Sequence, residues 1–221
     1  MNAGHEKLVI DVVSDVVCPW CYVGKKRLEQ AIAAQPEPIA VNWRPYQLDP
    51  TIPPDGLERR AYMRNKFGGD GRLDAAHERL RQLGAPLGIS FQFERIERAP
   101  NTLDAHRLIR WASVTGAQDA VVDRLFQLYF EQGRDIGERA VLLDIASQCG
   151  MDVEVIEKLF NEGADIDEVR AEIAQAQTLG VTGVPFFIFA SRFGVPGAQE
   201  TAVLEKAIDQ ARKALAGVEA A

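Results

Sequence analysis

Residues 8–21 read Leu-Val-Ile-Asp-Val-Val-Ser-Asp-Val-Val-Cys-Pro-Trp-Cys. The β-branched residues at 8–13 predict one buried strand. Apolar residues recur at helical spacing after Pro19, so an amphipathic helix is expected to begin near this proline, which is tolerated in a first turn. Cys18 and Cys21 would then lie at the N-terminus of a helix that directly follows a strand.

The rest of the chain predicts two further groups of elements. Residues 39–48 alternate loosely and predict a second strand, which makes the first fifty residues a βαβ unit with a right-handed crossover. A breaker-rich linker at 50–56 follows, and helical signals dominate from there to about residue 180. The helix in this region that begins at Leu57 is expected to run to Phe67.

The chain returns to β structure near its end. Residues 184–189 are apolar on both faces, as in a central strand, and 193–195 can form a short partner before a last helix. The predicted fold class is therefore α/β, a βαβ…ββα core interrupted by a long all-helical insertion. The expected domains are a core of residues 1–50 and 178–221 and an insertion of residues 51–177.

Composition excludes several classes of function. The 221 residues carry 25 basic and 32 acidic side chains, a net charge of −7, so a nucleic-acid groove is not expected. No stretch reaches the roughly 20 apolar residues that span a bilayer. Residues 1–7 are polar, which does not fit a signal peptide, and three cysteines are too few for a disulfide scaffold. We expect a cytoplasmic protein with no membrane or nucleic-acid partner, either a monomer or a homodimer.

The Cys18-x-x-Cys21 spacing at a helix start is typical of dithiol chemistry. Unpaired amide groups and the positive end of the helix dipole would stabilise a thiolate at Cys18, which makes it a nucleophile and a leaving group. Cys21, one turn further, would be less exposed and would resolve a mixed disulfide. Two alternatives are a zinc site, for which no second cysteine pair exists, and two structural cysteines. No metal is expected.

A second motif is Val184-Pro185, a proline at the start of the apolar strand, where it removes a ladder donor. A cis bond there would expose the Val184 backbone, and this backbone could pair with an extended peptide or a thiol tripeptide beside Cys18. A trans turn proline is the alternative. Trp20 is expected to be exposed and, with Pro19, to contact the substrate and tune the thiolate.

Four other side chains are weaker candidates. Asp11 and Asp15 precede Cys18, and a buried carboxylate near the pair could remove the proton of Cys21. Of the two, Asp11 is preferred for that role, but an ordinary strand-end or loop aspartate is the favoured interpretation. His106 is expected to be a half-buried histidine without a catalytic role. Cys149 lies on an apolar helical stripe and is expected to be a buried core thiol.

Taken together, these segments resemble the DsbA family of thioredoxin-fold oxidoreductases, and the FrnE-like branch in particular. The resemblance covers about residues 7–212 and rests on the segments 14–24 (SDVVCPWCYVG), 101–106 (NTLDAH), 183–185 (GVP) and 195–199 (VPGAQ). It implies a thioredoxin-like fold in which Cys18 is the nucleophile, Cys21 the resolving thiol and Pro185 a cis-proline beside them.

The resemblance implies a cytoplasmic thiol–disulfide oxidoreductase. Its redox-active centre would be the cysteine pair itself, with no cofactor. Dithiol or disulfide peptides, or small thiols such as glutathione, would be its partners. The same fold family holds the glutathione-dependent 2-hydroxychromene-2-carboxylate isomerases and kappa-class glutathione transferases. These typically carry serine at the position of Cys18, so the retained pair favours dithiol chemistry, with an isomerase or transferase as the alternative. The direction of exchange cannot be read from the sequence.

Overall fold

The structure is a computed structural model, and it describes residues 7–68 and 70–219. Its main sheet has the strand order β2-β1-β5-β6, built from β1 (Val9–Ser14), β2 (Ala40–Pro45), β5 (Phe186–Phe189) and β6 (Phe193–Pro196). β1 pairs with β2 in parallel and with β5 antiparallel, and β6 is antiparallel to β5. The predicted βαβ and ββα halves therefore share one sheet. β2 is shorter than the predicted 39–48, because the chain leaves the sheet after Pro45.

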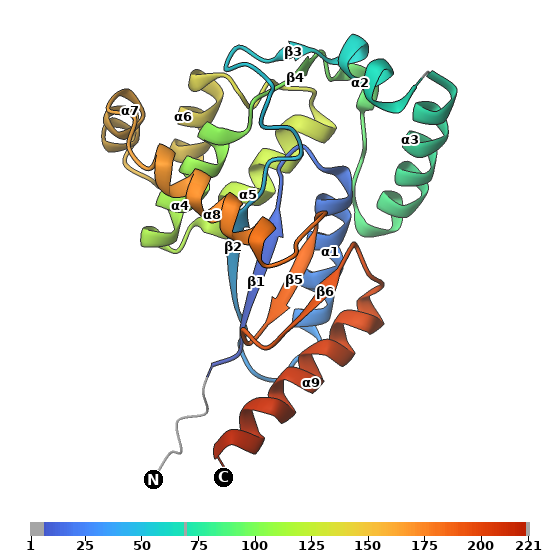
Figure 1. The fold of residues 1–221 in the computed structure, drawn as a ribbon, viewed down its shortest axis with the longest axis vertical. Helices are drawn as coiled ribbons and strands as arrows, with labels where there is room; N and C mark the ends of the chain where they lie inside the picture. The colour runs from blue at the N-terminus through green and yellow to red at the C-terminus, as the bar shows by residue number, and fades with distance from the viewer. Residues whose placement is uncertain (1–6, 69, 220–221) are drawn as a thin grey trace.

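Two helices of the core pack beside this sheet. α1 (Pro19–Ala33) connects β1 with β2, and α9 (Thr201–Glu219) follows β6 and contacts α1 (Figure 1). Arg27 of α1 donates hydrogen bonds to the Ala198 carbonyl and to the Glu200 carboxylate, both at 2.7 Å. The start of the last helix is thereby attached to the helix that carries the cysteines.

The insertion confirms the expected helices. They are α2 (Arg59–Phe67), α3 (Asp70–Gly84), α4 (Leu103–Thr115), α5 (Gln118–Phe126), α6 (Arg139–Gln148), α7 (Val153–Asn161) and α8 (Ile166–Thr178). Short helical turns lie at 85–87 and 93–95, and α5 continues as a π-helical turn at 127–131. α2 and α3 stand at the end of the molecule opposite the two chain termini (Figure 1).

One part of the insertion differs from the prediction. Residues 57–58 form a strand, β3 (Leu57–Glu58), that pairs with β4 (Arg98–Ala99), so the insertion is not entirely helical. The helix begins only at Arg59, because the Glu58 carboxylate accepts hydrogen bonds from the amides of Arg60 and Ala61 and so caps it.

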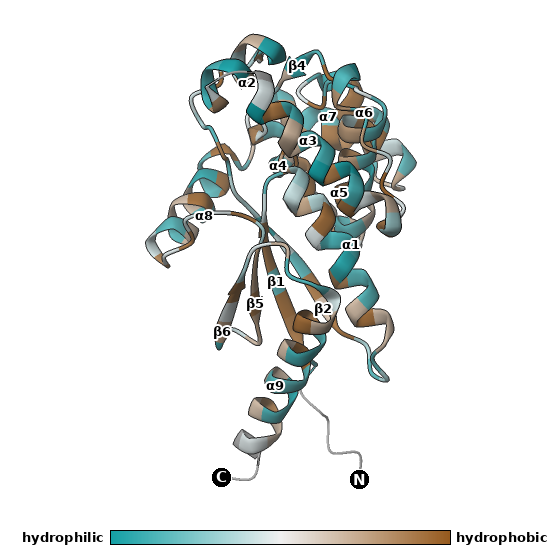
Figure 2. Cartoon of the chain, turned by 90° about the vertical axis from the view of Figure 1, so that its right-hand side faces the viewer, coloured by the Kyte–Doolittle hydropathy of each residue, from teal (hydrophilic) through white to brown (hydrophobic). Residues whose placement is uncertain are grey.

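The core and the insertion share one hydrophobic cluster. It includes Ile10 and Phe187 of the sheet as well as Leu125 and Ile145 of the insertion. In Figure 2, β1 and β5 are largely apolar, and the helices carry both hydrophilic and hydrophobic residues. The domain limits at 50 and 178 stay a prediction, since the cluster crosses them. Among the described residues, no helix is both long and apolar enough to cross a membrane.

Candidate active site

Cys18 occupies the N-cap position of α1, as the sequence predicted. Its backbone is extended (φ −92°, ψ 111°), and its side chain makes no capping hydrogen bond within the described residues. The Cys18 Sγ donates to the Val184 carbonyl oxygen at 3.6 Å. Both Cys18 and Cys21 are free thiols. Two segments 166 residues apart in sequence thus meet at this sulfur.

The turn that brings Val184 to the cysteine contains the predicted proline. The Val184–Pro185 peptide bond is cis, in agreement with the prediction. Pro185 is buried, and its ring lies against α1: a Cβ built on Gly24 would meet Pro185 Cγ at 2.9 Å. A glycine at 24 therefore lets the helix and the proline turn approach closely. Val184 itself is half-buried, with its carbonyl directed to the sulfur.

Cys21 lies beneath Cys18 and is the less accessible thiol, with 1% of its surface exposed against 4% for Cys18. Burial raises the pKa of Cys21 well above its usual value, and a hydrogen bond and charge interaction with Cys18 act in the same direction. The Ser14 side chain and the Asp15 backbone oppose this increase in the pKa. Cys21 is therefore held as a protonated thiol until a base removes its proton.

A cavity of about 410 Å³ opens at Cys18. Pro19, Trp20 and Val184 line it, together with residues of α2 and α3. Trp20 is half-buried, not exposed as predicted, because the insertion covers it. The Arg79 guanidinium of α3 lies 5.8 Å from the centre of the Trp20 ring. Of the four residues predicted to contact the substrate, Pro19, Trp20 and Val184 line the cavity, and Pro185 does not.

The structure places Asp15, not Asp11, at the cysteine pair. Asp15 has no exposed surface, lines the cavity, and accepts a hydrogen bond from the Leu48 amide at 2.8 Å. Its other oxygen, Oδ1, lies 3.4 Å from His106 Nε2, and neither atom has a hydrogen-bond partner in the described chain. The preference for Asp11 was wrong, since Asp11 is bound to Arg44 at 2.9 Å and does not line this cavity.

His106 also differs from the expectation. It is 3% exposed, not half-buried, and it faces Asp15 from the first turn of α4. On its other side, His106 lines a second cavity of about 240 Å³, together with Ser14, Arg44, Arg110 and Glu172. The Asp15–His106 pair thus lies between the site of the cysteines and a cavity on another part of the molecule.

Cys149 is not a core thiol. It occupies the C-cap of α6, just past the last helical residue, and is half-buried. Burial raises its pKa, partly opposed by the charge of Arg124. Cys149 does not line the cavity at Cys18.

Two cavity residues escaped the sequence analysis. Arg59 begins α2 and His77 lies in α3. The His77 ring stacks on Phe93, with the ring centres 4.0 Å apart. Burial, with smaller effects from Arg59 and Arg81, lowers the pKa of His77 to about 4, so it is neutral at pH 7. No spacing in the sequence marks these residues, because only the packing of the insertion brings them to the cysteines.

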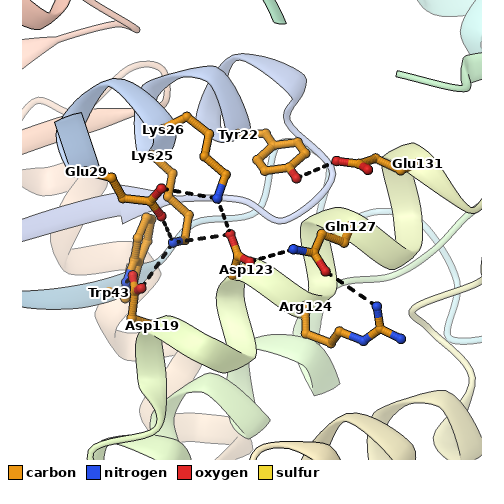
Figure 3. A network of polar contacts seen from close by, with 10 residues as sticks. All are labelled: Tyr22, Lys25, Lys26, Glu29, Trp43, Asp119, Asp123, Arg124, Gln127 and Glu131. Carbon is orange, nitrogen blue, oxygen red and sulfur yellow. Dashed lines mark hydrogen bonds and ion pairs between the residues drawn. The ribbon is translucent and has the colours of Figure 1, made fainter. Parts of the chain in front are cut away.

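A polar network attaches the helix of the cysteines to the insertion (Figure 3). Lys25 of α1 is 2% exposed, and its ammonium group forms ion pairs with Glu29 on its own helix and with Asp119 and Asp123 of α5. Asp123 also binds Lys26 at 2.7 Å. A buried ammonium group needs such partners, so the network fixes α1 against α5.

The chain is similar to several known proteins. A probable DsbA oxidoreductase from Streptomyces coelicolor, SCO1869, is 32% identical over 92% of this chain and 89% of its own, with a TM-score of 0.85. The uncharacterized protein YwbO of Bacillus subtilis is 26% identical over 205 residues, which are 92% of this chain and 97% of YwbO.

A structure of 2-hydroxychromene-2-carboxylate isomerase covers 95% of this chain and 98% of its own at a TM-score of 0.69, but with 17% identity this likeness concerns the fold alone. The family model of the DSBA-like thioredoxin domain matches residues 9–209. Because this match spans nearly the whole chain, the protein belongs to the DSBA-like thioredoxin domain family.

Proposed function

We propose that this protein is a cytoplasmic thiol–disulfide oxidoreductase that uses Cys18 and Cys21 as a dithiol/disulfide pair. The observation that carries this proposal is the position of Cys18. It lies at the N-cap of α1, in contact with the Val184 carbonyl and open to a cavity, with a buried thiol one turn behind it. The family and the similarity to a probable DsbA oxidoreductase support an oxidoreductase.

In the reducing direction, Cys18 attacks one sulfur of a substrate disulfide as a thiolate. The substrate S–S bond breaks, one substrate thiolate leaves, and a mixed disulfide with Cys18 forms. The positive end of α1 favours the negative charge on Cys18 before this step and on the leaving Cys18 thiolate in the opposite direction. The cavity wall at Trp20 and Val184 receives the substrate.

Cys21 then attacks the Cys18 sulfur, which releases the second substrate thiolate and leaves a Cys18–Cys21 disulfide. Cys21 must lose its proton first, and its raised pKa makes a nearby base necessary. Asp15 is our candidate, because it is buried at the pair and its Oδ1 has no hydrogen-bond partner among the described residues. His106, 3.4 Å away, would take the proton onward.

Trapping of mixed disulfides tests the roles of the two cysteines. The tests use variants in a Cys149→Ala background, so that no third thiol interferes. Cys21→Ser should accumulate a covalent adduct with a disulfide peptide, because the resolving thiol is absent. Cys18→Ser should form no adduct and show no turnover. Intact-mass and peptide mass spectrometry identify the residue that carries the adduct.

The Cys149→Ala protein with both catalytic thiols is the control and should exchange normally. An adduct on Cys21 in the Cys18→Ser protein, with none on Cys18 in the other variant, would reverse the assignment. Loss of exchange in the control at an unchanged melting temperature would show that Cys149 takes part.

A glutathione-dependent isomerase or transferase remains the second candidate, because the isomerase named above shares the fold and the cavity has the size of a small-molecule site. The presence of Cys18 argues against this candidate, because in a glutathione-dependent enzyme the reacting thiol is that of glutathione and the protein needs no thiol at this position. A glutathione-dependent isomerisation assay with 2-hydroxychromene-2-carboxylate, run beside a disulfide-reduction assay, separates the two. Isomerisation that survives Cys18→Ser would favour the second candidate.

A further inference from the structure

Arg59 is a buried cation without an acidic partner in the described part of the chain. Arg59 is 8% exposed and lines the cavity that opens at Cys18. Its Nη1 donates to the Phe93 carbonyl oxygen at 3.3 Å, its guanidinium lies 5.9 Å from the centre of the Phe93 ring, and the Tyr129 hydroxyl is beside it. Within residues 7–68 and 70–219, no carboxylate comes within 4.0 Å of this guanidinium.

A buried guanidinium is costly unless its charge is compensated, and it offers five N–H donors in a planar arrangement. The contact with Phe93 uses only part of that capacity. The remaining donors are those that a carboxylate accepts in a bidentate pair. Arg59 therefore has the free N–H donors and the uncompensated charge that an anion-binding group needs.

Other titratable groups also line the cavity, and most have interactions of their own. The Lys66 ammonium donates to the Tyr62 hydroxyl at 2.9 Å. The Asp49 carboxylate accepts hydrogen bonds from Thr51 and Tyr62, at 2.5 Å and 3.0 Å between side-chain oxygens, and so does not need the arginine. Asp15 faces His106. His77 is neutral at pH 7, since its pKa is lowered to about 4 by burial first and by neighbouring arginines next.

The rest of the wall is apolar and aromatic. Met63 and Leu80 of the insertion, with Phe93, face the cavity opposite Trp20. The volume of about 410 Å³ lies within the roughly 300–1,000 Å³ of small-molecule sites. Cys18 opens into the same space, so one small ligand can reach both the sulfur and the guanidinium.

We propose that Arg59 binds the carboxylate of a small aromatic thiol or disulfide while the sulfur of that molecule meets Cys18. This inference rests on the proposed thiol–disulfide exchange and adds the class of substrate. The aromatic ring lies against the apolar wall, and the Arg59–carboxylate pair sets the orientation of the substrate.

The exchange balances in two steps. The Cys18 thiolate attacks one sulfur of the aromatic disulfide, whose S–S bond breaks, and one aromatic thiolate leaves. Cys21 gives up its proton and attacks the Cys18 sulfur, and the second aromatic thiolate leaves. Two electrons pass from the protein dithiol to the substrate, and the two thiol protons pass to solvent or to the released thiolates.

The experiment compares two aromatic disulfides of different charge. Reduced protein in the Cys149→Ala background is mixed with dithiobis(nitrobenzoate), which carries a carboxylate on each ring, or with dithiodipyridine, which is uncharged. The absorbance of the released thiol gives the second-order rate constant for each disulfide. The salt concentration is kept near 0.15 M so that long-range charge effects are screened.

Arg59→Gln should slow the reaction with dithiobis(nitrobenzoate) by about tenfold or more, the size expected for one lost charge-assisted hydrogen bond. The reaction with dithiodipyridine should stay within about twofold, because it makes no such bond. Arg59→Lys should restore part of the rate with the charged disulfide. Arg60→Gln is the matched control, since Arg60 is the neighbouring arginine but is exposed, and it should change neither rate.

Equal losses with both disulfides in Arg59→Gln would show that the arginine acts on Cys18 or on the fold, and would overturn the inference. No loss with either disulfide would overturn it as well. If the unsubstituted protein reacts with neither disulfide, the proposed exchange itself fails. The melting temperature of each variant identifies one that is merely unfolded.

Discussion

Asp15 is completely buried, and its Oδ1 has no hydrogen-bond partner among the residues that the structure describes, which is uncommon for a buried polar atom. The facing His106 Nε2 is in the same state. His106 also lines the second cavity, where Arg44, Arg110 and Glu172 are the charged neighbours, whereas Asp15 lines the first cavity with Asp49, Arg59 and Lys66. The pair is thus placed to carry a proton between the site of the cysteines and the second cavity.

We expect Asp15→Asn to slow the attack of Cys21 on the mixed disulfide by about 100-fold, within the range of general acid–base catalysis. The amide keeps an oxygen for the Leu48 hydrogen bond but cannot take a proton. Rapid-quench measurement of the mixed disulfide checks the rate of this attack. In Asp15→Asn the mixed disulfide should accumulate most at low pH, where hydroxide cannot replace the base.

Asp11→Asn is the matched control and should resolve the mixed disulfide at the unsubstituted rate, because its carboxylate serves Arg44. The same slowing in both variants, or a pH profile of resolution that Asp15→Asn leaves unchanged, would contradict the role of Asp15.

These residues also show how far the sequence could predict the site. Cys18, Cys21 and Pro185 could be found because local spacing and a proline at a strand start mark them. The choice between Asp11 and Asp15 could not be made, because both lie within seven residues of Cys18. Their difference depends on which neighbours the sheet and α4 provide. His106 lies 91 positions after Asp15 and meets it only through the packing of the insertion.

At the scale of elements, the active site depends on how closely α1 approaches the turn before β5. The approach is close at Gly24, where a built Cβ would lie 2.9 Å from Pro185 Cγ and 3.2 Å from Phe187 Cζ. Both neighbours are rigid rings in the packed core, so neither can easily move aside. A larger residue at 24 must push α1 away from the turn that holds Val184.

We expect Gly24→Ala to lower the free energy of unfolding by about 1–3 kcal/mol, as overpacking does, and to slow exchange at Cys18. Gly217→Ala in α9 is the matched control, because its built Cβ would meet nothing within 4 Å. That variant should be neutral or gain up to about 1 kcal/mol from helix propensity, with exchange unchanged. Urea denaturation and the disulfide-reduction rate measure both effects, and normal exchange in a folded Gly24→Ala protein would count against this account.

The elements themselves were largely predictable, since strand runs and helical periodicities are local patterns. The exception was the segment at 57–58, whose composition suits a helix. Pairing with Arg98–Ala99, some forty residues on, makes it a strand. Such a contact depends on the fold of the whole insertion and leaves no local pattern in the sequence.

At the scale of the whole molecule, the insertion contributes to stability as well as to the cavity, because it shares the hydrophobic cluster of the sheet. His77 of α3 lies at this junction, stacked on Phe93 between Arg59 and Arg81. Its pKa is lowered from 6.5 to about 4 by burial and then by the two arginines. His77 therefore binds a proton more weakly in the folded chain than in the unfolded chain.

It follows that the unfolded chain binds more protons than the folded chain between about pH 6.5 and pH 4. We expect the free energy of unfolding to be highest above this window and to fall as the pH drops through it. His77→Gln cannot titrate, so it should flatten this part of the pH dependence. Asp123→Asn is the control. Burial would raise the pKa of the Asp123 carboxyl, but Lys26 and Lys25 outweigh burial, so this pKa is below its usual 3.8. Titration of Asp123 therefore changes the free energy of unfolding at a lower pH than titration of His77 does. Urea denaturation at a series of pH values measures all three proteins, and equal slopes in the unsubstituted protein and His77→Gln would show that the proton on His77 does not limit the stability of the fold.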